Sequence, residues 1–232
     1  MNKLWIFGDS FSEPFSKVKA LLWKTKYIQW KGYMPKCYGE VISDKLKLKH
    51  INLAIGGTDN YTILDTIINV LNSIEPDDII IIGWSSTLRF RLVNKTNTFN
   101  TILPGARYTL DDFSSNVELS KSTLEELAVN RDNSIYIDEL NNYIKLLNFA
   151  FPNNKIIHWS PFFRQEIGGI LTTRSNINSN LNHLKNLERV TDETKGEIND
   201  YHYSENGHII LAEEFINIIK NYETPKIKKP ML

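Results

Sequence analysis

The chain has 232 residues, enough for one large domain with a sizeable core, and its 27 basic residues balance its 27 acidic residues. A chain without net charge has no electrostatic excess with which to hold nucleic acid or an anionic membrane, so we expect neither as a partner. The single cysteine, Cys37, excludes an intramolecular disulfide and a cysteine-based zinc site. No apolar run approaches the roughly 18 residues that a membrane-spanning helix needs, and no secretory signal precedes the first run. We therefore expect a soluble, cytoplasmic protein.

Four short apolar runs predict the strands of a sheet. They lie at residues 4–7, 50–55, 79–82 and 155–160. The third run is unbroken isoleucine, which is typical of a strand buried on both faces. This strand is therefore expected at the centre of a parallel sheet.

Amphipathic stretches at helical spacing separate these runs. They predict helices over about 35–48, after the turn at 56–60, over about 134–150 and over 204–222. The second helix is expected to bury Ile63, Leu64, Ile67, Ile68 and Leu71, and the last one Ile209, Ala212, Phe215, Ile216 and Ile219. Strand, turn and helix in alternation indicate an α/β domain with a mostly parallel sheet.

Two polar stretches interrupt this alternation. Residues 85–130 and 164–198 lack apolar periodicity, apart from a helical pattern around 181–187. Long irregular segments are uncommon in compact domains and are usually functional, and we expect the first to cross the surface near the carboxyl ends of the strands. No stronger boundary divides the chain, so we expect one domain over 1–222 and a frayed tail over 223–232.

The turn after the first run places a hydroxyl where open α/β sheets bind ligands. Gly8-Asp9-Ser10 ends the run 4–7, so Ser10 is expected at the carboxyl end of a strand. For an isolated tripeptide, the competing interpretation is that Asp9 and Ser10 cap a turn or a helix start. A nucleophilic role for Ser10 therefore depends on partners elsewhere in the chain.

A serine nucleophile needs a base, and the base is usually histidine oriented by a third group. The histidines of the chain are His50, His158, His183, His202 and His208. Only His202 has an acid beside it, Asp200, in a loop that precedes a helix. In a doubly wound sheet this loop opens onto the same edge as the Ser10 turn, so the two can meet. The competing interpretation is a surface histidine in a polar turn, and we interpret His208 as a helix-start residue packed beneath that turn.

Four sequence blocks resemble those of the SGNH, or GDSL-like, hydrolases. Residues 8–12, Gly-Asp-Ser-Phe-Ser, resemble the first block, and residues 200–202, Asp-Tyr-His, resemble the last. Residues 52–57, Asn-Leu-Ala-Ile-Gly-Gly, are similar to the second block, and residues 83–86, Gly-Trp-Ser-Ser, stand in the place of the third. The order and spacing follow the family across nearly the whole chain. A Gly-Trp-Ser-Ser run followed by an arginine is similar to a phage-encoded branch of the family.

The resemblance implies a three-layer α/β/α, flavodoxin-like fold and a serine hydrolase site. It implies that Ser10 is the nucleophile, that His202 is the base and that Asp200 orients His202. The oxyanion hole is expected to take backbone N–H groups from Ser10 and Gly57 and a third donor from Ser85. No cofactor and no metal are expected.

The chain departs from the family pattern at two places. The asparagine that donates to the oxyanion in the third block is replaced by Ser85, and Thr87 or Arg89 are alternative donors. A positioned oxyanion donor contributes about two to three orders of magnitude in rate. The aspartate that usually lies three positions before the histidine is replaced by Asn199, while Asp200 lies one residue closer. We favour Asp200, since only a carboxylate both orients the imidazole and stabilises the imidazolium.

The resemblance favours a serine esterase or deacylase acting on a small acyl ester, such as acetyl on a carbohydrate. The expected partner is a small-molecule or glycan ester. Acyl transfer to a sugar hydroxyl uses the same residues, and a ligand-binding protein that lost catalysis with its oxyanion asparagine uses the same scaffold. The sequence leaves these alternatives, the substrate and the oligomeric state open.

Overall fold

A computed structural model describes residues 2–17, 22–86, 89–93, 99–102, 133–161 and 187–222. The main strands are β1 (Lys3–Gly8), β2 (Lys49–Asn52), β3 (Ile79–Gly83) and β6 (Lys155–Trp159). The helices are α1 (Leu22–Lys31), α2 (Tyr38–Leu46), α3 (Asn60–Asn69), α6 (Asn133–Ala150), α8 (Val190–Glu193) and α9 (Glu205–Lys220), with short 3-10 helices η1 (Phe15–Lys17) and η2 (Leu71–Ser73).

The four main strands form one parallel sheet in the order β2-β1-β3-β6. This order matches the first four strands of the flavodoxin-like arrangement. Strand β3 lies between β1 and β6, and all of its residues are buried, as its isoleucine run predicts. The register pairs Leu4 with Ile79 and Gly8 with Gly83, so β1 and β3 end side by side.

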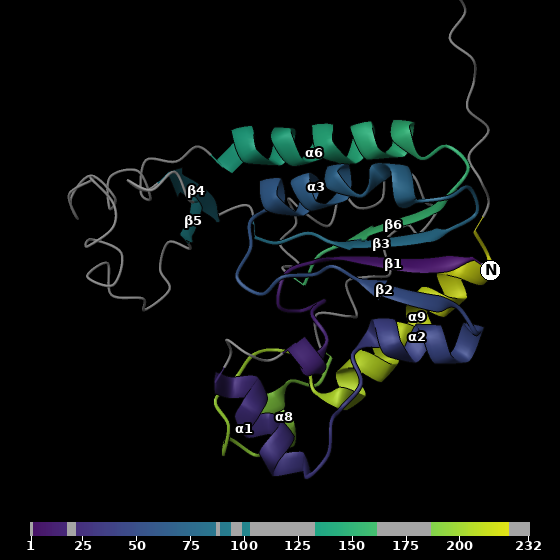
Figure 1. Cartoon of the computed structure of the whole chain (residues 1–232). Helices are drawn as coiled ribbons and strands as arrows, with labels where there is room; N and C mark the ends of the chain where they lie inside the picture. Colours follow the sequence, from purple (N-terminus) through teal and green to yellow (C-terminus); the bar gives the residue numbers. More distant parts are fainter. Residues whose placement is uncertain are drawn as a thin grey trace, which may run out of the picture.

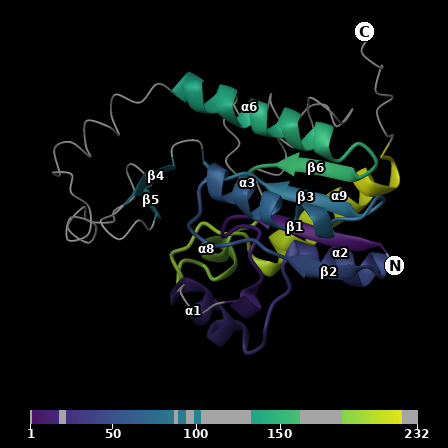
Figure 2. The ribbon, with the colours of Figure 1, turned by 45° about the horizontal axis from the view of Figure 1, so that its top comes forward.

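Helices cover both faces of the sheet, which makes a three-layer α/β/α fold (Figure 1). Helices α3 and α6 lie on one face, and α2 and α9 lie on the other. The same division is visible in the turned view (Figure 2). Because the strands are parallel and every crossover passes through a helix, their carboxyl ends meet at one edge of the sheet.

The buried faces of α3 and α9 differ from those that the sequence pattern predicts. In α3, Ile63, Leu64 and Ile67 are buried, whereas Ile68 is 50% exposed and Leu71 is 38% exposed. The helix ends at Asn69, so Leu71 falls in η2 and leaves the helical face. In α9, the expected inward residues are buried except Ile209, which is 36% exposed.

A second, smaller core lies below the carboxyl ends of the strands. Helices α1 and α8 and the turn η1 gather there, away from the layers that cover the sheet (Figure 1). Its buried residues are Phe15, Tyr27, Cys37, Val190 and Ile198. Tyr27 donates a hydrogen bond to Glu193 and accepts one from the backbone N–H of Glu205, which ties α1 to α8 and α9. This small core supports the loop between α8 and α9.

Parts of the two polar stretches have structure that the sequence pattern did not predict. Strands β4 (Phe90–Val93) and β5 (Phe99–Ile102) pair antiparallel within the first stretch. The second stretch contains α8. The helix predicted around 181–187 lies outside the described residues except for residue 187. The tail predicted at 223–232 also lies outside them. Among the described residues, no helix has the length and apolar character needed to cross a membrane.

Candidate active site

The Ser10 turn is a tight structure at the end of β1. The backbone N–H groups of Ser12 and Glu13 donate to the carbonyl of Asp9, at 2.9 and 3.1 Å. The Ser12 side chain lies over Gly8 and Gly83, which are paired at the ends of β1 and β3. A Cβ atom added to Gly8 would lie 2.5 Å from the Ser12 hydroxyl oxygen, and a Cβ atom added to Gly83 would lie 2.3 Å from it. Glycine is therefore required at both strand ends, and Gly8 also has a φ of +151°. The turn leaves Ser10 mostly buried, with 7% of its surface exposed.

His202 reaches Ser10 from the loop between α8 and α9. The hydroxyl oxygen of Ser10 lies 2.7 Å from Nε2 of His202. Nδ1 of His202 lies 2.6 Å from Oδ1 of Asp200, which also accepts the backbone N–H of His202 at 3.0 Å. Because a carboxylate only accepts hydrogen bonds, Nδ1 carries the proton and Nε2 accepts from the Ser10 hydroxyl. The arrangement can remove the proton of the Ser10 hydroxyl during attack on a carbonyl carbon.

Helix α8 holds the backbone of this loop. The Thr191 hydroxyl is hydrogen-bonded to both the backbone N–H and the carbonyl of Asp200, at 2.6 and 2.7 Å. The backbone N–H of Val190 donates to the carbonyl of His202 at 2.9 Å. Asp200 is buried, whereas Asn199 is exposed. The structure therefore brings Asp200, and not Asn199, to the imidazole.

The Phe11 ring packs against the imidazole of His202. The Phe11 ring lies 4.5 Å from that of His202, measured between ring centroids. The Arg189 guanidinium lies 4.0 Å from the Tyr203 ring centroid and 5.8 Å from that of Phe11.

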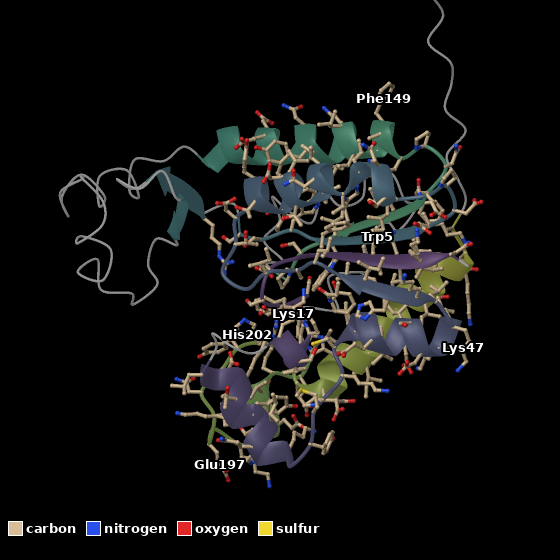
Figure 3. The ribbon with its side chains drawn as sticks, in the orientation of Figure 1. Trp5, Lys17, Lys47, Phe149, Glu197 and His202 are labelled. Atoms are coloured by element: carbon tan, nitrogen blue, oxygen red, sulfur yellow. The ribbon has the colours of Figure 1, made fainter. Side chains whose placement is uncertain are left out.

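Burial raises the pKa of the Tyr203 hydroxyl to about 12. Figure 3 shows His202 on the side of the molecule where the parallel strands end.

The backbone N–H groups of Ser10 and Gly57, the donors expected for an oxyanion, lie in loops at this edge of the sheet. Gly57 has a φ of +79°, and a Cβ built on it would meet nothing within 4 Å. Among the described residues, no acceptor takes a hydrogen bond from the backbone N–H of Gly57 or of Ser10. The backbone N–H of Ile55 donates to the carbonyl of Gly8 at 2.9 Å, which joins the loop that carries Gly57 to the last residue of β1. Both donors therefore belong to loops at the same edge of the sheet.

The structure does not bring the Ser85 hydroxyl to this position. Ser85 is fully buried, and its hydroxyl donates to Oδ2 of Asp9 at 3.1 Å. The side-chain carbonyl of Asn60 accepts the backbone N–H of Ser85 at 2.7 Å, and its NH2 group donates to the Ser85 carbonyl at 3.1 Å. Since a hydroxyl has one proton, this arrangement leaves Ser85 no proton for a substrate oxyanion.

Asp9 is a buried carboxylate at the centre of a small polar network. Its Oδ1 accepts the backbone N–H of Phe11 at 3.1 Å, and its Oδ2 accepts from Ser85 and from Nη1 of Arg89, the latter at 3.3 Å. Burial raises the pKa of Asp9, while Arg89 and the hydrogen bonds act in the opposite direction. Nη1 of Arg89 also donates to the carbonyl of Thr58 at 2.8 Å. Thr87, the other alternative donor, lies outside the described residues.

The other described histidines lie apart from this arrangement. His208 is buried beneath the loop against Phe15, Tyr38 and Tyr203, and burial lowers its pKa to about 3. His158 accepts from the indole N–H of Trp84 at its Nδ1, at 3.1 Å, within the core. His50 lies in β2, where burial lowers the pKa of its imidazole. None of these three histidines is hydrogen-bonded to Ser10 among the described contacts. His183 lies outside the described residues.

The buried carboxylates Asp59 and Asp78 have structural partners. Asp59 caps α3 by accepting the backbone N–H of Thr62 at 2.7 Å. Asp78 accepts the indole N–H of Trp5 at 2.8 Å and the backbone N–H of Lys3 at 2.8 Å. In the part of the chain that the structure describes, no three His, Cys, Asp or Glu side chains form a group able to hold a metal ion.

The sequence does not predict the contacts that three residues make in the site. Asn60 lies at the start of a predicted helix, and no sequence pattern links it to Ser85, 25 residues later. Phe11 is one position of the Gly-Asp-Ser-Phe-Ser block, and Arg189 lies in a polar stretch without periodicity. Their roles depend on contacts between segments up to 192 residues apart, as for Ser10 and His202, which local patterns do not encode.

No family model, no curated protein and no solved structure matches this chain.

Proposed function

We propose that this chain is a serine hydrolase that cleaves a small carboxylic ester, of the acetyl type, on a small molecule or a glycan. The observation that carries the proposal is the hydrogen-bonded series from the Ser10 hydroxyl through the His202 imidazole to the Asp200 carboxylate, with distances of 2.7 and 2.6 Å. This series supplies a nucleophile, a base and an orienting acid in the order that acyl transfer to serine requires. The resemblance of residues 8–12 and 200–202 to the SGNH hydrolases supports the same chemistry.

The proposed cycle uses atoms of three residues. Nε2 of His202 takes the Ser10 proton as the hydroxyl oxygen attacks the ester carbonyl, and the negative oxygen accepts from the backbone N–H groups of Ser10 and Gly57. The ester bond breaks, and the leaving alkoxide takes the proton from Nε2. Water then attacks the acyl-enzyme, giving its proton to Nε2, and the acid leaves as Ser10 recovers its proton.

A hydrolysis assay with a matched serine variant tests the proposal. Ser10→Ala should abolish the hydrolysis of a chromogenic acetyl ester, because no other described group replaces the nucleophile. Ser73→Ala is the control, since Ser73 is an exposed serine in η2, which precedes β3 and so lies at the opposite edge of the sheet. Full activity in Ser10→Ala would exclude the proposal.

One observation favours a second candidate, a ligand-binding protein with weakened catalysis. The hydroxyl of Ser85 is committed to Asp9, so the candidate oxyanion hole has backbone donors alone. A missing side-chain donor lowers the rate by about two to three orders of magnitude. This candidate predicts measurable affinity for a glycan ester without turnover, which calorimetry and the chromogenic assay distinguish from hydrolysis.

A further inference from the structure

Two loops carry the backbone groups proposed to hold the oxyanion, and one arginine touches both. Asp9 directly precedes Ser10, and Thr58 directly follows Gly57. Nη1 of Arg89 donates to Oδ2 of Asp9 at 3.3 Å and to the carbonyl of Thr58 at 2.8 Å. An NH2 nitrogen of a guanidinium has two protons, one for each of these acceptors. A single nitrogen therefore links the two loops.

We propose that Arg89 is a positioning residue, which holds the Ser10 and Gly57 turns together so that their N–H groups converge on one oxyanion. This inference rests on the proposed function. In this role Arg89 does not itself donate to the oxyanion, because its Nη1 donates to Asp9 and to Thr58. The position of the two backbone donors matters more because the Ser85 hydroxyl donates its hydrogen bond to Asp9 and gives none to the oxyanion.

Burial makes this link strong and specific. The Asp9 side chain is fully buried, and the Arg89 side chain is only 11% exposed. A charged pair removed from water is weakly screened, and a hydrogen bond between charged groups is stronger than one between neutral groups. The backbone N–H of Arg89 donates to the carbonyl of Ser86 at 3.1 Å, which fixes the start of the side chain just after β3. Arg89 is thus anchored to the third loop while it joins the other two.

The kinetic test removes the link and then restores it. Arg89→Ala should lower kcat for the chromogenic ester about 100-fold, because misplacing a donor by about 1 Å has a cost of that order, while KM changes less than threefold. Added methylguanidinium should recover kcat at least tenfold by occupying the vacated position. Lys45→Ala is the control, since Lys45 is an exposed cation paired with Glu213, and it should show neither the loss nor the recovery.

A second variant guards against misfolding, because Arg89→Ala leaves the buried Asp9 carboxylate without its cation. Asp9→Asn/Arg89→Met removes both charges together and should still turn over at least tenfold more slowly than the wild type. A kcat within threefold of the wild type in either folded variant overturns the inference, as does a loss carried by KM alone. Failure of methylguanidinium to restore a folded Arg89→Ala also overturns it.

A measurement without turnover separates this inference from the proposed function. In amide NMR spectra, Arg89→Ala should shift the signals of Ser10 and Gly57 together, while Lys45→Ala leaves both in place. If the wild-type protein hydrolyses no ester, the proposed function fails, and joint shifts still establish the link between the loops. If the two signals are unchanged in a folded Arg89→Ala protein, the link itself is refuted.

Discussion

Replacing Asp200 with asparagine tests the orientation of His202 with little change in shape. The backbone of Asp200 is held by Thr191 at 2.6 and 2.7 Å, so the loop should keep its position in Asp200→Asn. The amide removes the negative charge beside Nδ1 and can present its NH2 group there, which reverses the tautomer of His202. The same change in serine hydrolases with such an arrangement lowers kcat about 10⁴-fold, equivalent to about 5 kcal/mol in the barrier. Asp200 is buried, so solvent screening reduces this effect little.

The assay is kcat for the chromogenic acetyl ester, with Asn199→Ala as the matched control. Asn199 is the adjacent residue, and it is exposed. We expect Asn199→Ala to stay within threefold of the wild type and Asp200→Asn to fall by at least 10³-fold with unchanged circular dichroism. A large loss in Asn199→Ala with near-normal activity in Asp200→Asn would refute the assignment of the orienting acid.

Three further predictions concern the elements that support the site. Burial lowers the pKa of His208 from 6.5 to about 3, so below pH 6.5 the unfolded chain binds a proton that the folded chain does not bind. The free energy of unfolding should therefore fall by about 2 kcal/mol between pH 7 and pH 5. Urea titrations at the two pH values should show this fall in the wild type and not in His208→Leu. Ser204 accepts the backbone N–H of Gly207 at 3.0 Å as the α9 N-cap, so Ser204→Ala should lower the free energy of unfolding by about 1 kcal/mol, and a change below 0.3 kcal/mol would contradict this. Gly83→Ala places a Cβ 2.3 Å from the Ser12 hydroxyl oxygen, so it should cost about 1–3 kcal/mol of stability and slow turnover; an unchanged melting temperature would show that the strand end tolerates a side chain.

The sequence predicted the sheet well because its strands are short, apolar and bounded by turn residues. The isoleucine run at 79–82 is buried as expected, and the helices over 134–150 and 204–222 are observed within two residues of their predicted limits. It failed where the outcome depends on contacts. Ile68 is exposed although it lies on the apolar side of α3, and the sequence of β4 and β5 lacks the apolar alternation that would distinguish strands from a loop.

The site shows the same division between local and non-local information. Ser10 and His202 are singled out by local features, the Gly-Asp-Ser turn and the aspartate two residues before the histidine, and the structure places them in contact. The orientation of the Ser85 hydroxyl is not predictable from the sequence, because it depends on Asp9, a buried carboxylate 76 residues away that accepts its hydrogen bond. Burial made Asp9 an acceptor that needs partners, and Ser85 and Arg89 supply them.

The most direct test of the central claim is covalent labelling of the protein with a fluorophosphonate, followed by mass spectrometry of its peptides. The probe reacts only with a serine whose proton is removed by a neighbouring base. We predict one adduct, on Ser10, that disappears in His202→Ala and is retained in Ser73→Ala. An unlabelled wild-type protein, or labelling of Ser10 that persists without His202, would contradict an activated serine at this site.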